Sequence, residues 1–189
     1  AILAVSLAVL NLAAKSLDLP LYRYVNKVFN DINGVNLVMQ MPVPMLNIIN
    51  GGEHADNNLD IQEFMIMPIG ANSFYEAMQW STEIYSNLKK LLQTKGLSTS
   101  VGDEGGFAPN LSSNDETIEL IITAIRNNKL VEGKDVGIAL DCAASEFYND
   151  GIYNLKGEQK ELNSTEFSQY LSELTNQYPI ISIEDGMDE

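Results

Sequence analysis

Hydrophobic residues recur every three or four positions in several stretches of the chain, the spacing that places them on one face of a helix. Residues that typically start or stop helices bound these stretches. The first predicted helix runs from the start to about Leu17 and ends before Pro20. The second begins at Phe74, after an N-cap at Ser73, and ends before Gly96. The third begins with the capping-box pattern Ser113-x-x-Glu116 and continues through Ile125, and a fourth begins at about Ser164. Residues 20–40 carry Asn30-Asp31 and Asn33-Gly34, and we interpret them as a connection between domains.

Short apolar runs bounded by turn residues predict strands elsewhere. These strands cover Val43–Ile49, Phe64–Ile69, Val136–Leu140 and Ile180–Ile183, and Phe147–Leu155 is interpreted as a hairpin around Asp150-Gly151. After the first two strands, helices and strands alternate, which indicates parallel strands covered by helices. We therefore predict an α/β fold. Its four core strands are too few to close an eight-stranded barrel, but they could form the start of one.

Charge and composition narrow the classes of partner. The 189 residues carry 26 acids against 11 bases, a formal net charge of −15. Binding to nucleic acid or to anionic membranes requires a basic surface, so we expect neither as a partner. The apolar run at residues 1–14 is shorter than the ~20 residues of a membrane span and is interpreted as a small-residue core helix. A single cysteine excludes an intrachain disulfide and indicates a reducing compartment, so we expect a cytoplasmic location.

Two acids follow directly after predicted strands. Asp141 follows Ile138-Ala139-Leu140, and Glu184 follows Ile181-Ser182-Ile183. The carboxyl ends of parallel strands in a barrel share one face, and two carboxylates there repel each other unless a cation lies between them. Oxygen ligands without neighbouring Cys or His favour Mg²⁺. From spacing alone, an equally good interpretation has Asp141 capping a turn and Glu184 in a surface ion pair.

Three other segments offer candidate chemistry. Glu104 lies between glycines in Gly102-Asp-Glu-Gly-Gly106, where a carboxyl with a raised pKa would serve as a general acid, although an ordinary acidic turn is the simpler interpretation. His54 is the only histidine and lies in a polar loop, and Gln62-Glu63 opens a strand; solvated side chains are the alternative for all three. Cys142 has no second histidine to activate it and is interpreted as a packed thiol.

Together these segments resemble the enolase family. The matching stretches are Met41–Asp56, Asp60–Ile66, Val101–Asn110, Ala139–Tyr148 and Tyr178–Asp188, in family order and at family spacing; details within Glu53–Asn57 and Asp185–Asp188 resemble the bacterial branch. The resemblance implies that residues 1–40 are the end of a small α+β N-terminal domain and its linker. Residues 41–189 would then be the first half of the catalytic β/α barrel.

The resemblance also implies the reaction and its residues. It is the reversible, Mg²⁺-dependent dehydration of 2-phosphoglycerate to phosphoenolpyruvate, by homodimers or rings of dimers. Asp141 and Glu184 would bind the metal, and Glu104 would be the proton donor. The substrate would be bound by His54, Gln62, Glu63 and Glu184.

The chain starts at Ala1 rather than Met, so we expect a piece of a longer protein. The family pattern places a third metal ligand and the lysine that abstracts the proton outside these residues. The chain alone is therefore expected to lack activity and, with uncovered strand edges, to be unstable or to aggregate. One alternative is another enolase-superfamily enzyme, acting on a non-phosphorylated acid. The second is a non-catalytic binding protein on this fold, with a secreted or cell-surface pool.

Overall fold

The computed structural model describes residues 2–189, which divide into two compact units. The first unit ends at Pro42, and the second runs from Val43 to Glu189. The first contains the helices α1 (Ile2–Ser16) and α2 (Leu21–Asn33). The second contains a four-stranded sheet, a three-stranded hairpin sheet and the remaining helices.

Helix α1 was predicted from its sequence, except that Ala1 lies outside the described residues. The expectation that it is a core helix is wrong, because Ala14 is its only buried residue. Ala and Leu cover its whole circumference, so the sequence does not distinguish a buried side from an exposed one. Among the described residues, no single helix has the length and hydrophobicity to cross a membrane. Only α1 and α2 taken together, with a 96° bend between them, reach such a length and composition.

Helix α2 occupies residues 21–33, so the interpretation of residues 20–40 as a connection is wrong for that part, although the chain does divide into its two units shortly afterwards, after Pro42. Its Asn residues were read as loop formers, yet its apolar residues recur at helical spacing through Leu21, Val25, Val28 and Ile32. Pro20 precedes the helix, and Gly34 ends it with a left-handed φ of 64°. These end signals outweigh the local preference of Asn for turns.

The four-stranded sheet has the order β1-β2-β3-β7. Its strands are β1 (Leu46–Asn50), β2 (Glu63–Met67), β3 (Gly137–Asp141) and β7 (Ile180–Glu184), as the apolar runs predicted. β2 is antiparallel to β1 and to β3, whereas β3 and β7 are parallel, as the alternation of strands and helices indicated. The sheet is mixed and is not closed into a barrel.

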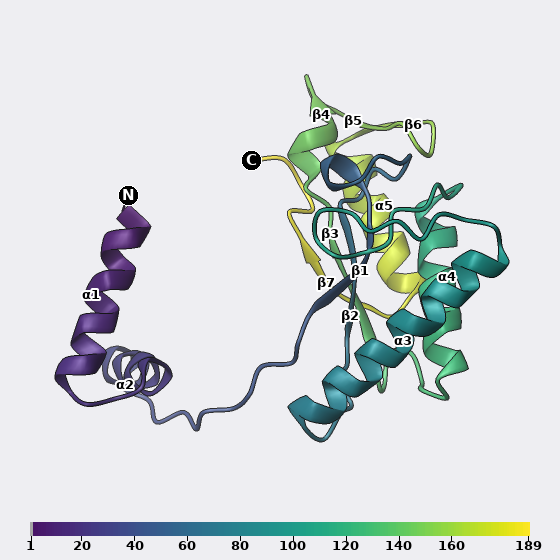
Figure 1. Ribbon diagram of the computed structural model, residues 1–189. Helices are drawn as coiled ribbons and strands as arrows, with labels where there is room; N and C mark the ends of the chain where they lie inside the picture. Colours follow the sequence, from purple (N-terminus) through teal and green to yellow (C-terminus); the bar gives the residue numbers. More distant parts are fainter. Residues whose placement is uncertain (1) are drawn as a thin grey trace. The chain divides into compact units, whose positions relative to one another are not determined.

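Helices α3 (Phe74–Thr94), α4 (Asn114–Asn127) and α5 (Ser164–Gln177) pack against the sheet (Figure 1). Short 3₁₀ turns, η1 (Gly52–His54) and η2 (Ala144–Phe147), follow β1 and β3. The predicted N-cap Ser73 accepts a hydrogen bond from the Glu76 N–H. At α4 the predicted capping box is only half formed. Ser113 accepts from the Glu116 N–H, but the Glu116 carboxylate instead accepts from Ser112 N–H and Oγ–H.

A second sheet is formed by β4 (Tyr148–Asn149), β5 (Ile152–Leu155) and β6 (Lys160–Asn163). The turn predicted at Asp150-Gly151 is present, and both residues have positive φ, 48° and 89°. Strand β6 was not predicted, because Lys-Glu-Leu-Asn has no apolar alternation; pairing with β5 alone makes it a strand.

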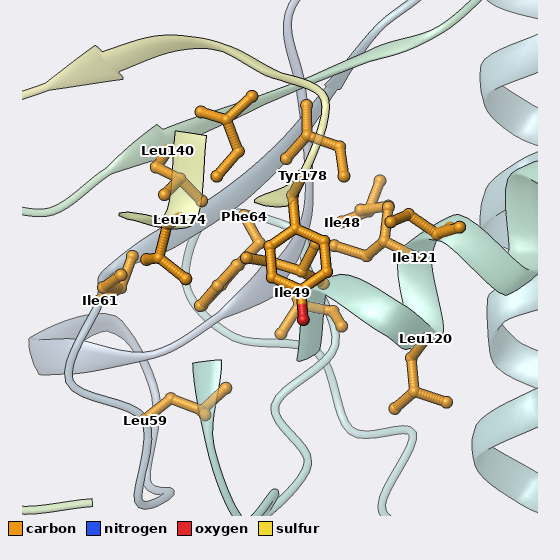
Figure 2. Close-up of a cluster of buried hydrophobic side chains, with 14 of the residues drawn as sticks. Ile48, Ile49, Leu59, Ile61, Phe64, Leu120, Ile121, Leu140, Leu174 and Tyr178 are labelled. Carbon is orange, nitrogen blue, oxygen red and sulfur yellow. The ribbon is translucent and has the colours of Figure 1, made fainter. Parts of the chain in front are cut away.

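Buried side chains lie opposite one another on neighbouring strands of the main sheet. Ile49, Phe64 and Leu140 lie opposite one another across β1, β2 and β3, and all three are fully buried within the cluster shown in Figure 2. Burial of each such side chain contributes roughly 1.5–3 kcal/mol. The residues next to them, Ile48, Met65 and Ala139, are buried as well, so both faces of the sheet are covered here. A shift by one residue would instead break the alignment of the polar residues at the strand ends. The next residue along each strand then faces the opposite side of the sheet.

Candidate active site

Four polar side chains stand in one row across the end of the main sheet. The backbone pairs Asn50 with Glu63, Glu63 with Asp141, and Asp141 with Glu184. Strand β2 runs in the opposite direction to its neighbours, so its first residue lies at the edge where β1, β3 and β7 end. Side chains of directly paired residues point to the same face, and neighbouring strands are about 4.8 Å apart. Three acids therefore lie on adjacent strands at one edge of the sheet.

A glycine-rich loop brings a fourth acid to this row. Residues 101–107 are tied to β1 by two backbone hydrogen bonds, from Phe107 N to the Ile48 carbonyl (3.0 Å) and from Asn50 N to the Phe107 carbonyl (2.9 Å). Glu104 lies within this loop, and its Oε2 is 2.9 Å from His54 Nδ1. The two atoms are close, but they are not aligned as in a hydrogen bond.

His54, Glu63 and Glu104 form a compact cluster, in which one potential ligand atom from each lies within 4.8 Å of the others. The pKa of Glu63 is raised to about 8, chiefly by burial and also by the hydrogen bond with Glu104 and the charges of Glu104, Asp141 and Glu184. The pKa of Glu104 is lowered, chiefly by its hydrogen bond with Glu63 and also by His54. At neutral pH the two glutamates therefore share one proton, held mostly on Glu63.

Asp141 sits beside this cluster and is oriented by its neighbours. Gln62 Nε2 donates to Asp141 Oδ2 (3.3 Å), and the Ala143 N–H donates to Oδ1 (3.1 Å). Burial raises the pKa of Asp141, while these hydrogen bonds oppose the rise and the charge of Asp185 adds to it. A carboxylate that is partly buried near other acids is stabilised by a cation.

The structure thus brings all six candidate site residues to one end of the sheet. Asp141 and Glu184 lie at the ends of neighbouring parallel strands, as the sequence predicted. His54, Glu63 and Glu104 also lie close enough to one another to hold a metal ion, a group of three that the sequence did not predict. Cys142 is fully buried, and burial raises the pKa of its thiol to about 12, so it is a packed residue and not a nucleophile.

The arrangement of strands and acids can now be compared with known families. Residues 38–189 match the model of the enolase C-terminal TIM barrel domain. The chain belongs to the enolase family. Enolases are hydro-lyases that use Mg²⁺ and bind 2-phosphoglycerate, and the described sheet is an open part of the barrel domain.

The side chains at the sheet edge fit a magnesium ion. Asp141 and Glu184 offer carboxylate oxygens, the ligands that Mg²⁺ prefers, on adjacent strand ends. The cluster of His54, Glu63 and Glu104 fits magnesium less well, because it includes an imidazole nitrogen and because Glu63 keeps its proton.

Sequence reasoning missed Asn50, which lies in the row of polar side chains and is fully buried. The signal that was available is its position: like Asp141, it is the polar residue that ends a buried apolar run, Leu46-Asn-Ile-Ile49. Sequence reasoning also missed Tyr85, because the contact of its hydroxyl with the loop of Glu104 cannot be predicted from helical periodicity.

Proposed function

We propose that this chain provides the metal-binding and proton-donating half of an enolase site for the reversible dehydration of 2-phosphoglycerate to phosphoenolpyruvate. The observation that supports this best is the row of Glu63, Asp141 and Glu184 across one sheet edge, with Glu104 brought against it. A role in packing alone would require none of these acids, and grouping them has an electrostatic cost that a cation would offset.

Each residue has a distinct part in this proposal. Asp141 and Glu184 would hold Mg²⁺, which when bound offsets the negative charge that develops on the substrate carboxylate. Gln62 orients Asp141 through its amide. Substrate would be contacted by Gln62 and by His54, Glu63 and Glu184. A protein of net charge −15 repels an anionic substrate, so positive charge at the sheet edge is also needed for binding.

The proton for the departing hydroxyl would come from the Glu63–Glu104 pair. The family resemblance assigns Glu104 as the donor, whereas in the described site the proton resides mostly on Glu63. Both assignments hold if Glu104 donates its proton to the departing hydroxyl and Glu63 then passes its own proton to Glu104. Two coupled carboxyls with separated pKa values are a common arrangement for acid catalysis near neutral pH.

The test uses the complete gene product, because we expect the base and a third metal ligand to lie outside these residues. The wild-type protein should form phosphoenolpyruvate in a Mg²⁺-dependent manner, and Glu104→Gln should lower kcat by about 10²–10⁴-fold, the usual contribution of a general acid. Glu161→Gln, which changes an exposed acid on the hairpin, is the matched control and should retain activity.

Two outcomes would contradict the proposal. Absence of turnover in the wild-type gene product would favour the non-catalytic binding protein instead. Full activity of Glu104→Gln would remove the proton-donating role. Metal binding is measured separately on the 189-residue chain by titration calorimetry, where Asp141→Asn should weaken the binding of Mg²⁺ and Glu161→Gln should not.

A further inference from the structure

The peptide group that follows Glu104 and Gly105 is hydrogen-bonded at both ends by side chains from outside its loop. The Tyr85 hydroxyl of α3 donates to the Gly105 carbonyl (2.8 Å). The Gly106 N–H on the same peptide donates to Asn50 Oδ1 at the end of β1 (2.8 Å). The Gly105–Gly106 peptide, one residue beyond Glu104, is thus held between helix α3 and strand β1.

We propose that Asn50 and Tyr85 are positioning residues, which hold the 101–107 loop so that the Glu104 carboxylate meets Glu63 and His54. This inference rests on the proposed function, because it assigns these residues to proton delivery in that reaction. Neither is expected to contact substrate through the groups described here.

The loop fits against Asn50 without spare room. A methyl group added at Gly106 would lie 2.6 Å from Asn50 Oδ1 and 2.9 Å from Asn50 N. One added at Gly102 would lie 2.7 Å from the His54 carbonyl oxygen and 2.9 Å from Asn50 Cβ. All these contacts are shorter than carbon atoms tolerate, so glycine at both positions is what allows the loop to approach β1 so closely.

Asn50 is an unfavourable residue for packing alone. It is fully buried, and its Nδ2 has no hydrogen-bond partner within the described residues. Only its oxygen can accept from the Gly106 N–H, so the orientation of the amide is determined. An unpaired buried donor is destabilising, so holding the Gly106 N–H, rather than filling the core, is the role that fits this side chain.

Tyr85 supports the other side of the loop in two ways. Its ring stacks on Phe107, with centroids 4.3 Å apart and planes at 14°, and Phe107 is itself hydrogen-bonded to β1. Burial raises the pKa of Tyr85, so the hydroxyl keeps its proton and remains a donor at neutral pH. The loop has almost no regular structure of its own, so these side chains limit how far Glu104 can move.

The decisive variant is Tyr85→Phe in the complete gene product, because it removes the hydroxyl and keeps the stacked ring. Loss of one hydrogen bond that positions a proton donor should lower kcat roughly threefold to tenfold. The KM for 2-phosphoglycerate should change less than twofold, since no substrate contact is removed. Tyr75→Phe, on the same helix with its side chain 80% exposed, is the matched control and should behave as wild type. Equal kcat values for the two variants would overturn the proposal.

A second measurement does not depend on activity. Hydrogen exchange in the complete gene product, followed by mass spectrometry, reports on how firmly the 101–107 loop is held. Tyr85→Phe and Gly106→Ala should speed amide exchange in peptides that contain Gly106, and Tyr75→Phe should not. Unchanged exchange in both loop variants would overturn the proposal. An inactive wild-type gene product would instead defeat the proposed function, and the exchange result would still decide on the two positioning residues.

Discussion

The proton held on Glu63 is the most informative feature at the scale of single residues. This side chain lies at the first position of β2, between Asn50 and Asp141 in the row of polar side chains. Its burial and the neighbouring acids keep it protonated to a pH of about 8, far above the ordinary value of 4.5. The site therefore stores one proton near neutral pH without a second histidine.

The stability of the chain should depend on pH through Glu63. A carboxyl whose pKa is raised by folding binds more protons in the folded than in the unfolded state, so stability is greatest below 4.5 for this group and is lost as pH rises towards about 8. We expect the melting temperature to fall between pH 5.5 and 8.5, and to fall less in Glu63→Gln. With a single histidine, few other side chains change charge in this window. A steeper fall in Glu63→Gln than in wild type would contradict this account.

At the scale of elements, the helix ends show how side chains in the sequence determine where each helix begins. α5 has a complete capping box: Asn163 Oδ1 accepts from the Thr165 and Glu166 N–H groups at 3.0 and 3.1 Å, and the Glu166 carboxylate accepts from the Asn163 N–H at 2.9 Å. α4 has only one half of this pattern. The same cap residue also ends β6, so it connects the hairpin to the helix.

Asn163→Ala should therefore destabilise the chain by about 1 kcal/mol, within the range of roughly 0.5–2 found for N-cap removal. Asn176→Ala changes an exposed asparagine in the last turn of the same helix and should be neutral, because Ala is a better helix former. Chemical denaturation of both variants measures the difference in the free energy of unfolding, provided that this free energy has the same dependence on denaturant concentration in each. Equal midpoints would mean that the capping box does not stabilise the fold.

At the scale of the whole second unit, the open sheet is the main structural consequence of the described fold. β7 pairs with β3 on one side, and among the described residues no strand pairs with its other side. Ile181 on this strand is 47% exposed. An unpaired strand edge with an exposed β-branched side chain promotes association between chains, and the high negative charge of the chain opposes it.

We expect the 189-residue chain to associate as its concentration rises, and more strongly at high salt, where repulsion is screened. Ile181→Lys should reduce this association, because a charge on an edge strand disfavours pairing while the aliphatic part of Lys still covers Gly137. Ile69→Lys changes a 38% exposed position outside any strand, so it is the control and should leave the association unchanged. Analytical ultracentrifugation distinguishes these cases. If the chain stays monomeric at all concentrations and melts cooperatively, the unpaired edge of β7 does not cause association.

The sequence by itself determined much of the second unit, because its signals are local. Periodicity located α3, α4 and α5, apolar runs located the four strands, and Asp150-Gly151 located the turn of the hairpin. The acids that end β3 and β7 were visible as the polar residues after buried runs. Where local signals conflicted, as in α2, or were absent, as in β6, prediction failed.

Only the tertiary structure decided which residues meet. The reversed direction of β2 brings Glu63 to the edge where Asp141 lies, and strand direction is set by pairing and packing rather than by the residues of the strand. The 101–107 loop likewise meets Asn50 and Tyr85, which lie 56 and 20 positions away from it along the chain. Proton sharing between Glu63 and Glu104 follows from that approach, because a pKa depends on burial and on neighbours in space, which a linear sequence does not contain.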